Sequence, residues 1–120
     1  PGEEGLCERV LQNSRSSGVM AAPPTDLLEM TELIRMSRLL VTNDTGPLHI
    51  AVAVGVPTVS IWGPTDPERN GPYGHGHKVI LSGAPCRMCW KTSCPAQDSL
   101  ICMEQISVEE VWTAVREFLS

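Results

Sequence analysis

The chain has 120 residues, a length that suits one domain, and a net charge of −5. Hydrophobic residues make up 42% of it and charged residues 19%, which is enough apolar surface to exclude a disordered tail. The negative charge argues against a nucleic-acid binder that works through a basic face. No apolar run approaches the roughly 18 residues of a membrane span, so no transmembrane helix is predicted.

The N-terminus and the cysteine content bear on where the protein works. The chain begins Pro-Gly-Glu-Glu, without an initiator methionine and without the basic and then apolar regions of a secretory signal. We therefore expect a processed chain or a fragment of a longer one. The odd number of cysteines, 5, together with the lack of a signal, favours a reducing compartment, and we expect a cytoplasmic location.

Helical and strand patterns alternate along the chain. Apolar spacing and capping signals predict helices over residues 3–17, 26–38, 48–54 and 107–119. Short apolar runs predict strands over residues 18–22, 39–42, 57–61 and 77–81. Asp26 with Glu29, and Ser107 with Glu110, are capping-box pairs, which predict where the second and the last helix begin.

This alternation predicts the fold class. Helices between continuous apolar strands are typical of an α/β domain that is Rossmann-like, with a mostly parallel sheet flanked by helices. A doubly wound domain normally has one or more strands before its first helix, so we expect those first strands to be absent. Residues 1–120 are predicted to form one such partial domain, with a cysteine-rich loop over residues 86–102.

Several large apolar side chains are candidates for the core. The last helix carries an apolar stripe at helical spacing, made of Val108, Val111, Trp112, Val115 and Leu119. We expect this stripe, including Trp112, to be buried. Met36 is expected to fill the core or the end of the second helix. Trp62, at a predicted strand end, is placed either in the core or beside a cleft.

The strongest functional signal is a predicted strand that runs through a tight turn into a helix. In open α/β sheets, ligands bind at the carboxyl ends of the strands, where a helix N-terminus presents free amides and partial positive charge. Thr45, Gly46 and Leu48 offer backbone amides there. Asp44 suits sugar hydroxyls, and His49 lies on the first helical turn. The pattern predicts a site for a sugar diphosphate.

Other interpretations of the same turn stay open. Strand–turn–helix connections also use Asp, Thr and Gly only to cap and to turn. Asp44-Thr45-Gly46 is also the motif of half-size aspartic proteases, but that fold is nearly all β, and here the motif opens an apolar helix. His75 and His77 are placed either within reach of the phosphates or the acceptor, or in a plain solvent loop.

The block Val-Thr-Asn-Asp-Thr-Gly-Pro-Leu-His-Ile-Ala-Val-Ala, residues 41–53, resembles a signature of glycosyltransferase family 9. The members of this family are heptosyltransferases that build the lipopolysaccharide inner core. The resemblance continues through residues 55–67, which contain Gly-Pro-Thr, through Gly-Pro-Tyr-Gly at 71–74, and to the spaced cysteines that end at Cys102-Met103. It covers most of the chain from Leu27 onward, and the combination of these motifs is specific.

The resemblance implies a two-domain GT-B glycosyltransferase with its active site between the domains. The C-terminal domain of the family holds the nucleotide-sugar donor, usually ADP-heptose, and this chain resembles most of that domain. By this likeness, the backbone of Thr45, Gly46 and Leu48 would hold the diphosphate. Asp44 would contact the heptose, and His49 would support the phosphate side.

The likeness also implies where the remaining parts of the reaction lie. Thr25 and Asp26 fall where relatives border the adenine, and Glu4, or its neighbour Glu3, falls near an acidic residue that binds the ribose. The family's general base and its lipopolysaccharide acceptor site belong to an N-terminal domain. We therefore expect no catalytic residue here, no transfer by this chain alone, no cofactor for catalysis, and a peripheral position at the inner membrane, where the acceptor is a glycolipid.

Four of the five cysteines lie close together in sequence. Cys86, Cys89, Cys94 and Cys102 follow the spacing C-x2-C-x4-C-x7-C. Four-thiolate zinc sites usually contain a Cys-x2-Cys arm, so a structural zinc ion that orders this long loop is one interpretation. An iron–sulfur cluster, four unligated thiols or a disulfide are the alternatives, and elemental analysis separates them.

Two further function classes remain open beside the heptosyltransferase interpretation. The first is another GT-B enzyme or a sugar-nucleotide-binding domain that uses the same phosphate loop. A preference for UDP or GDP over ADP would reveal it. The second is a metal-stapled interaction domain without enzymatic activity, which predicts bound metal and no nucleotide affinity.

Overall fold

The computed structural model describes residues 2–95 and 100–120. The chain forms two compact units, Pro1–Met30 and Thr31–Ser120. Helix α1, Glu4–Asn13, belongs to the first unit, and helix α2, Leu27–Arg35, begins in the first unit and ends in the second. In the part of the chain that is described, no helix is long and apolar enough to cross a membrane.

The start of α2 follows the predicted capping box. The Glu29 amide donates to Asp26 Oδ1 at 2.8 Å, and the Asp26 amide donates to Glu29 Oε2 at 2.9 Å. Two amides that have no partner within the helix are thereby satisfied. Ser107 caps the last helix in the same way, because its hydroxyl accepts the amide of Glu110 at 3.1 Å. Both helix starts are therefore confirmed.

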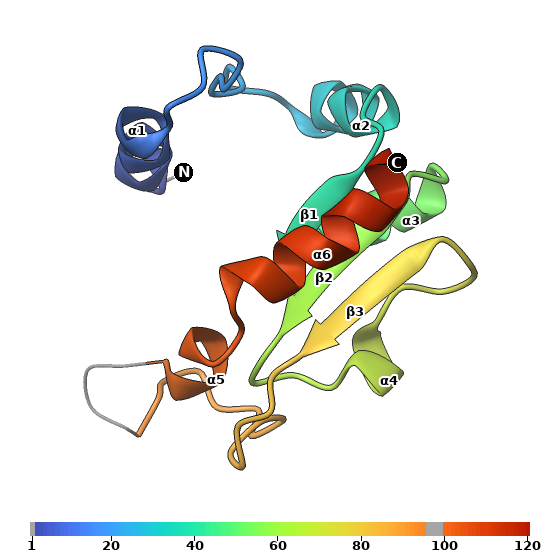
Figure 1. Ribbon diagram of the computed structural model, residues 1–120. Coiled ribbons are helices and arrows are strands. Elements are labelled where there is room, and N and C mark those ends of the chain that lie inside the picture. The colour runs from blue at the N-terminus through green and yellow to red at the C-terminus, as the bar shows by residue number, and fades with distance from the viewer. Residues whose placement is uncertain (1, 96–99) are drawn as a thin grey trace. The chain divides into compact units, whose positions relative to one another are not determined.

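The second unit is built on a three-stranded parallel sheet with the order β1-β2-β3 (Figure 1). Its strands are β1, Leu40–Asn43; β2, Thr58–Trp62; and β3, His77–Leu81. Leu40 lies opposite Thr58, and Trp62 lies opposite Leu81. Since all three strands run the same way, their carboxyl ends meet at one edge of the sheet. The predicted α/β class with a parallel sheet is confirmed.

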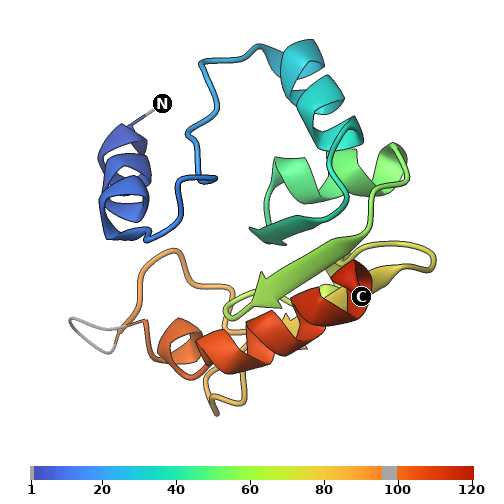
Figure 2. The same cartoon turned by 45° about the horizontal axis from the view of Figure 1, so that its top comes forward.

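Helices cover the two faces of this sheet (Figures 1 and 2). Helix α6, Val108–Leu119, lies on one face, and helix α3, Gly46–Ala53, lies on the other. The short helices α4, Pro67–Asn70, and α5, Ile101–Glu104, belong to the connections that follow β2 and β3. On one face, Val59 and Ile80 pack against Ala114 and Val115 of α6 to form the apolar core. Alternate strand residues point the other way, toward the face on which α3 contacts β1 and β2.

The α3 face of the sheet buries polar side chains together with Trp62. Thr58 and Ser60 are buried, and Trp62 is 0% exposed. Trp62 Nε1 donates to Ser60 Oγ at 2.8 Å, and Ser60 Oγ donates to the Lys78 carbonyl at 3.2 Å. No buried side-chain nitrogen or oxygen of residues 2–95 and 100–120 lacks a partner. Trp62 is therefore a core residue, and its single polar group is satisfied.

Three local predictions were wrong. Residues 18–22 form a turn and irregular chain, with Met20 86% exposed, because no neighbouring strand pairs with them in the described structure. Met36 is exposed because α2 has already ended at Arg35. Trp112 is 49% exposed and borders an apolar groove beside α6, and Val108 and Leu119 of the predicted stripe are exposed as well. The reason is that α6 meets the core through a stripe turned away from Trp112. This stripe consists of Val111, Ala114, Val115 and Phe118.

His77 begins β3, at the sheet edge opposite the carboxyl ends, which excludes a role at those ends. Its Nδ1 is 3.0 Å from Thr58 Oγ1, and burial lowers the pKa of His77. A lowered folded pKa means that the unfolded chain binds the proton more readily. His77 therefore stabilises the fold above its unfolded pKa of about 6.5, and this contribution is lost as pH falls through the lower folded pKa.

We expect the free energy of unfolding to decrease from pH 7.5 to pH 5.5, measured by urea denaturation. The His77→Gln variant should show a smaller decrease over the same interval. His75→Gln is the matched control, because His75 is exposed two residues away, and it should leave the pH dependence unchanged. Equal pH dependence in the wild type and His77→Gln would contradict the assignment.

Candidate functional site

The connection between β1 and α3 consists of two residues, Asp44 and Thr45. Thr45 is the N-cap residue with an extended backbone, φ −147° and ψ 169°, and its side chain makes no capping hydrogen bond. Its hydroxyl instead lies 3.2 Å from the hydroxyl of Thr42, back toward β1. The first amides of α3 are therefore not covered by the side chain that usually satisfies them.

The three predicted phosphate-binding amides are not equivalent. The Leu48 amide donates to the Thr45 carbonyl at 3.1 Å, so it is already engaged within the turn. No carbonyl in the described part of the chain accepts the amides of Thr45 or Gly46. Pro47 has no amide hydrogen to offer. Two amides at the positive end of the α3 dipole are therefore open to an anion, and the third completes the turn.

The surroundings of these amides leave room for a ligand. A Cβ built on Gly46 would meet no atom within 4 Å. His49, one turn into α3, is exposed, and Asp44 is half-buried. The Leu48 side chain is fully buried and anchors the helix to the core. The loop thus combines a fixed backbone with an open face, as a phosphate-binding turn requires.

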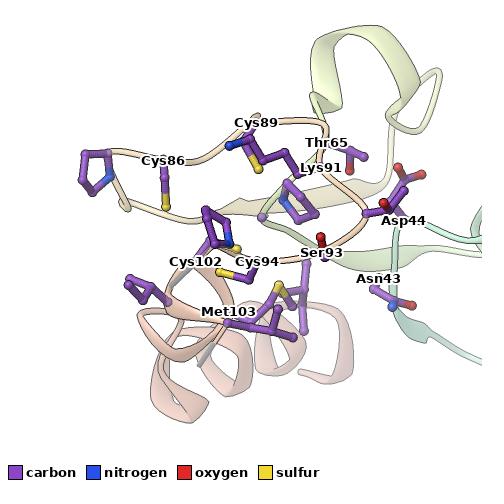
Figure 3. Close-up of a pocket in the computed structure, with 18 residues that line it drawn as sticks. Asn43, Asp44, Thr65, Cys86, Cys89, Lys91, Ser93, Cys94, Cys102 and Met103 are labelled. Atoms are coloured by element: carbon purple, nitrogen blue, oxygen red, sulfur yellow. The ribbon is translucent and has the colours of Figure 1, made fainter. Parts of the chain in front are cut away.

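A cavity of about 630 Å³ opens at the carboxyl edge of the sheet (Figure 3). Asn43 and Asp44 supply one end of it, Gly63, Pro64 and Thr65 follow β2, and the remaining wall comes from the cysteine loop and α5. The lining of that wall is Pro85, Cys86, Cys89, Lys91, Thr92, Ser93, Cys94, Pro95, Leu100, Ile101, Cys102 and Met103. Residues 96–99, within the predicted 86–102 loop, lie outside the described residues.

The cysteine loop is held against the end of β2 by backbone contacts. The Met88 amide donates to the Gly63 carbonyl, and the Trp90 amide donates to the Pro64 carbonyl, both at 2.8 Å. A Cβ on Gly63 would lie 2.8 Å from Cys102 Sγ, so only glycine allows this approach without a shift of α5. The Trp90 ring also packs on Arg69, whose guanidinium carbon is 5.2 Å from the ring centre.

The structure joins two sites that the sequence analysis treats separately. Asp44 and the four clustered cysteines line the same cavity, whereas Thr45, Gly46, Leu48 and His49 lie outside its lining. Asp44 is therefore the residue through which the connection between β1 and α3 meets the cavity.

The other predicted site residues belong to the first unit. Thr25, Asp26 and Glu4 all lie within Pro1–Met30. The Asp26 carboxylate is engaged in capping α2. Hydrogen bonds from its own amide and from Gly2 hold the pKa of Glu4 below its usual value. The contacts expected of Thr25 and Asp26 with adenine, and of Glu4 with ribose, stay predictions.

Sequence reasoning missed several polar residues of the cavity. Asn43, Thr65, Lys91 and Ser93 all line it. A signal was present for Asn43 and Thr65, since both follow apolar strands of one parallel sheet and so reach its carboxyl edge. No local pattern pointed to Lys91 or Ser93, because their position depends on how the cysteine loop folds back onto β2.

The cysteines in the cavity are thiols that lie near one another. All five cysteines of the chain are free, and Cys102 is buried. Burial raises the pKa of the Cys102 thiol, and the neighbouring Cys86, Cys89 and Cys94 raise it further. Within residues 2–95 and 100–120, no three His, Cys, Asp or Glu side chains are arranged closely enough to hold a metal ion.

Fold and site together define the class of the protein. The parallel sheet, and the helix whose open N-terminus lies at the sheet's carboxyl edge beside a cavity, are those of a Rossmann-like α/β domain. The match of the amino-acid sequence to a family model identifies the family. The model for glycosyltransferase family 9 (heptosyltransferase) matches residues 2–100, and the chain belongs to this family.

Relatives and solved structures agree with this assignment. The chain is 39% identical to lipopolysaccharide heptosyltransferase 1 of Pseudomonas aeruginosa over 75 residues, which are 62% of this chain and 21% of that protein. It is 26% identical to lipooligosaccharide heptosyltransferase 2 of Campylobacter jejuni over 121 residues, covering 98% of this chain and 38% of that protein. The chain therefore spans less than half the length of these relatives.

Two solved structures share the fold. A family 9 glycosyltransferase from Veillonella parvula superimposes with a TM-score of 0.82 at 25% identity, covering 99% of this chain and 34% of that one. The E. coli heptosyltransferase WaaC, solved with ADP, gives a TM-score of 0.76 at 24% identity, covering 98% of this chain and 31% of that one. The expected GT-B type of fold is confirmed.

Proposed function

We propose that this chain is the donor-binding part of an inverting heptosyltransferase that takes ADP-heptose and serves lipopolysaccharide core synthesis. The observation that carries the proposal is the pair of open amides, of Thr45 and Gly46, at the start of α3 with Asp44 directly before them. Open amides at a helix N-terminus form a site that suits the negative charge of a diphosphate. A sugar attached to it needs a hydrogen-bond acceptor at its hydroxyls, which the carboxylate of Asp44 offers at the cavity wall.

The comparisons support a nucleotide sugar of this kind. WaaC of E. coli is described with ADP, and the relatives are named heptosyltransferases that act on lipopolysaccharide or lipooligosaccharide. Family membership and the shared fold make the same donor the natural proposal for this chain. The acceptor and its binding site would belong to the part of such enzymes that this chain does not match. A cytoplasmic position at the inner membrane is part of this proposal.

The residues present suit one half of the reaction. In inverting transfer an acceptor hydroxyl loses its proton to a base and attacks the anomeric carbon, and the bond from that carbon to the diphosphate oxygen breaks. The diphosphate leaves with the bonding electron pair. The amides of Thr45 and Gly46 and the α3 dipole would stabilise its charge without reorganising. We assign the base to the N-terminal domain of the family, so this chain alone should bind donor and not transfer it.

A calorimetric titration with ADP, UDP and GDP tests the binding part of this proposal. We expect ADP to bind at least tenfold more tightly than UDP or GDP. A preference for UDP or GDP would favour another sugar-nucleotide enzyme. If no nucleotide bound at millimolar concentration, donor binding by this chain would be refuted. In parallel, a transfer assay with ADP-heptose and the inner-core acceptor should give no product above the enzyme-free rate, and measurable product would contradict the assignment of the base.

A further inference from the structure

The wall of the cavity opposite Asp44 carries four thiols. Cys86 and Cys89 lie on the loop after β3, Cys94 follows on the same loop, and Cys102 lies in α5. Figure 3 shows Asn43 and Asp44 at one end of the cavity and the four cysteines at the other. Three cysteines of one loop and one of α5 therefore line the same wall, although the donor proposal needs none of them.

These thiols are close enough to influence one another. Cys102 is buried, and its thiol interacts electrostatically with Cys86, Cys89 and Cys94. Cys94 is half-buried, Cys86 and Cys89 are exposed, and all three line the cavity. Cys102 is thus the fixed member of the group, with three accessible thiols around it.

The backbone around Cys89 is held in an unusual conformation. Met88 and Trp90, on either side of it, have φ of 58° and 57°, a left-handed region that residues other than glycine rarely adopt. Their amides donate to the carbonyls of Gly63 and Pro64 at the end of β2. This anchorage keeps the Cys86–Cys89 turn beside Cys102, since such strain persists only where the surroundings impose it.

We propose that Cys86, Cys89, Cys94 and Cys102 bind one zinc ion as thiolates. Zinc prefers four ligands in a tetrahedron, and Cys-x2-Cys is a usual arm of four-thiolate sites. Soft thiolates favour zinc over magnesium or calcium. Because no three of the described His, Cys, Asp or Glu side chains are placed to hold a metal, binding must draw the three accessible thiols onto Cys102. Zinc would thereby fix the loop that forms the cavity wall.

Cobalt substitution tests the site directly on the reduced protein. Titration of the chain with Co²⁺ should saturate at one equivalent and give thiolate-to-cobalt charge-transfer bands with intense tetrahedral d–d absorption. Added Zn²⁺ should abolish both signals. Protein purified without added metal should contain close to one equivalent of zinc by elemental analysis. Less than about a tenth of an equivalent, together with no cobalt spectrum, would overturn the proposal.

Single substitutions separate this site from adventitious thiol binding. Cys86→Ser and Cys89→Ser change exposed residues, so both variants should fold, which circular dichroism would verify. Each should weaken cobalt binding at least tenfold and alter the charge-transfer bands. Cys7→Ser is the matched control, since Cys7 is an exposed cysteine of α1 outside the cluster. Equal binding by Cys7→Ser and the cluster variants would refute a site at these four residues, as would iron with inorganic sulfide in place of zinc.

The zinc proposal is independent of the donor proposal. Zinc binding is measured without nucleotide, and nucleotide binding depends on the open amides of Thr45 and Gly46, which lie outside the thiol cluster. If the unmodified chain binds ADP but no cobalt, the metal site alone is refuted. If the unmodified chain binds cobalt but no ADP, the donor site alone is refuted.

Discussion

Replacing Gly46 with valine is expected to weaken ADP binding at least tenfold, or about 1.4 kcal/mol, and to leave the fold intact. The new side chain would occupy the open space beside the amides of Thr45 and Gly46, where the diphosphate is proposed to lie. Because a Cβ at this position would meet no protein atom within 4 Å, the free energy of unfolding should change by less than about 0.5 kcal/mol. Calorimetric titration with ADP and urea denaturation measure the two quantities on the same samples.

Two further variants show whether that loss is specific. Gly83→Val is the matched control, since a Cβ at Gly83 would also meet no atom within 4 Å and Gly83 does not line the cavity. It should retain ADP affinity. Asp44→Ala should weaken binding of the sugar nucleotide more than binding of ADP, because the carboxylate is assigned to the sugar. Unchanged ADP affinity in Gly46→Val would refute the phosphate assignment at this loop.

The second large effect is expected at Trp62, where substitution by alanine should lower the free energy of unfolding by about 3–5 kcal/mol. The side chain is fully buried at the end of β2, and its removal would leave a cavity under α3 together with the lost hydrogen bond to Ser60. Such a loss corresponds to a fall in Tm of roughly 10–20 °C for a domain of this size. Thermal and urea denaturation followed by circular dichroism measure it.

A milder variant keeps this test informative if Trp62→Ala does not fold. Trp62→Phe retains most of the packing and loses the indole hydrogen bond, and it should cost about 1–2 kcal/mol. Ser60 Oγ still donates to the Lys78 carbonyl in that variant, so no buried donor is stranded. Trp112→Ala is the control on an exposed tryptophan and should cost about 1 kcal/mol or less. Equal decreases in the free energy of unfolding for Trp62→Ala and Trp112→Ala would contradict the burial of Trp62 in the core.

Local signals in the sequence predicted much of the fold. The capping pairs at Asp26 and Ser107 were predicted correctly because a cap involves residues only three apart. Strands β1, β2 and β3 were predicted correctly from short apolar runs, because a strand buried in a parallel sheet is largely apolar along its length. The parallel order follows from helices placed between those strands.

Features that depend on contacts between distant parts of the chain were predicted less accurately. Residues 18–22 have strand-like composition but pair with no strand in the described structure, and pairing is a property of two segments. Periodicity gave the width of the apolar stripe on α6 but not its rotation, which was set by contact with Val59 and Ile80, and so Trp112 was misplaced. Helices α4 and α5 were missed because each has only four residues.

The sequence by itself determined the strand–turn–helix around Asp44, Thr45 and Gly46, since its parts are contiguous and follow local rules of backbone conformation. Only the tertiary structure showed that the Leu48 amide is engaged within the turn, leaving two amides open. The tertiary structure alone also brought Asp44 and the four cysteines to one cavity. The physical reason is that the carboxyl ends of parallel strands share an edge, so loops far apart in sequence meet there only when the sheet has formed.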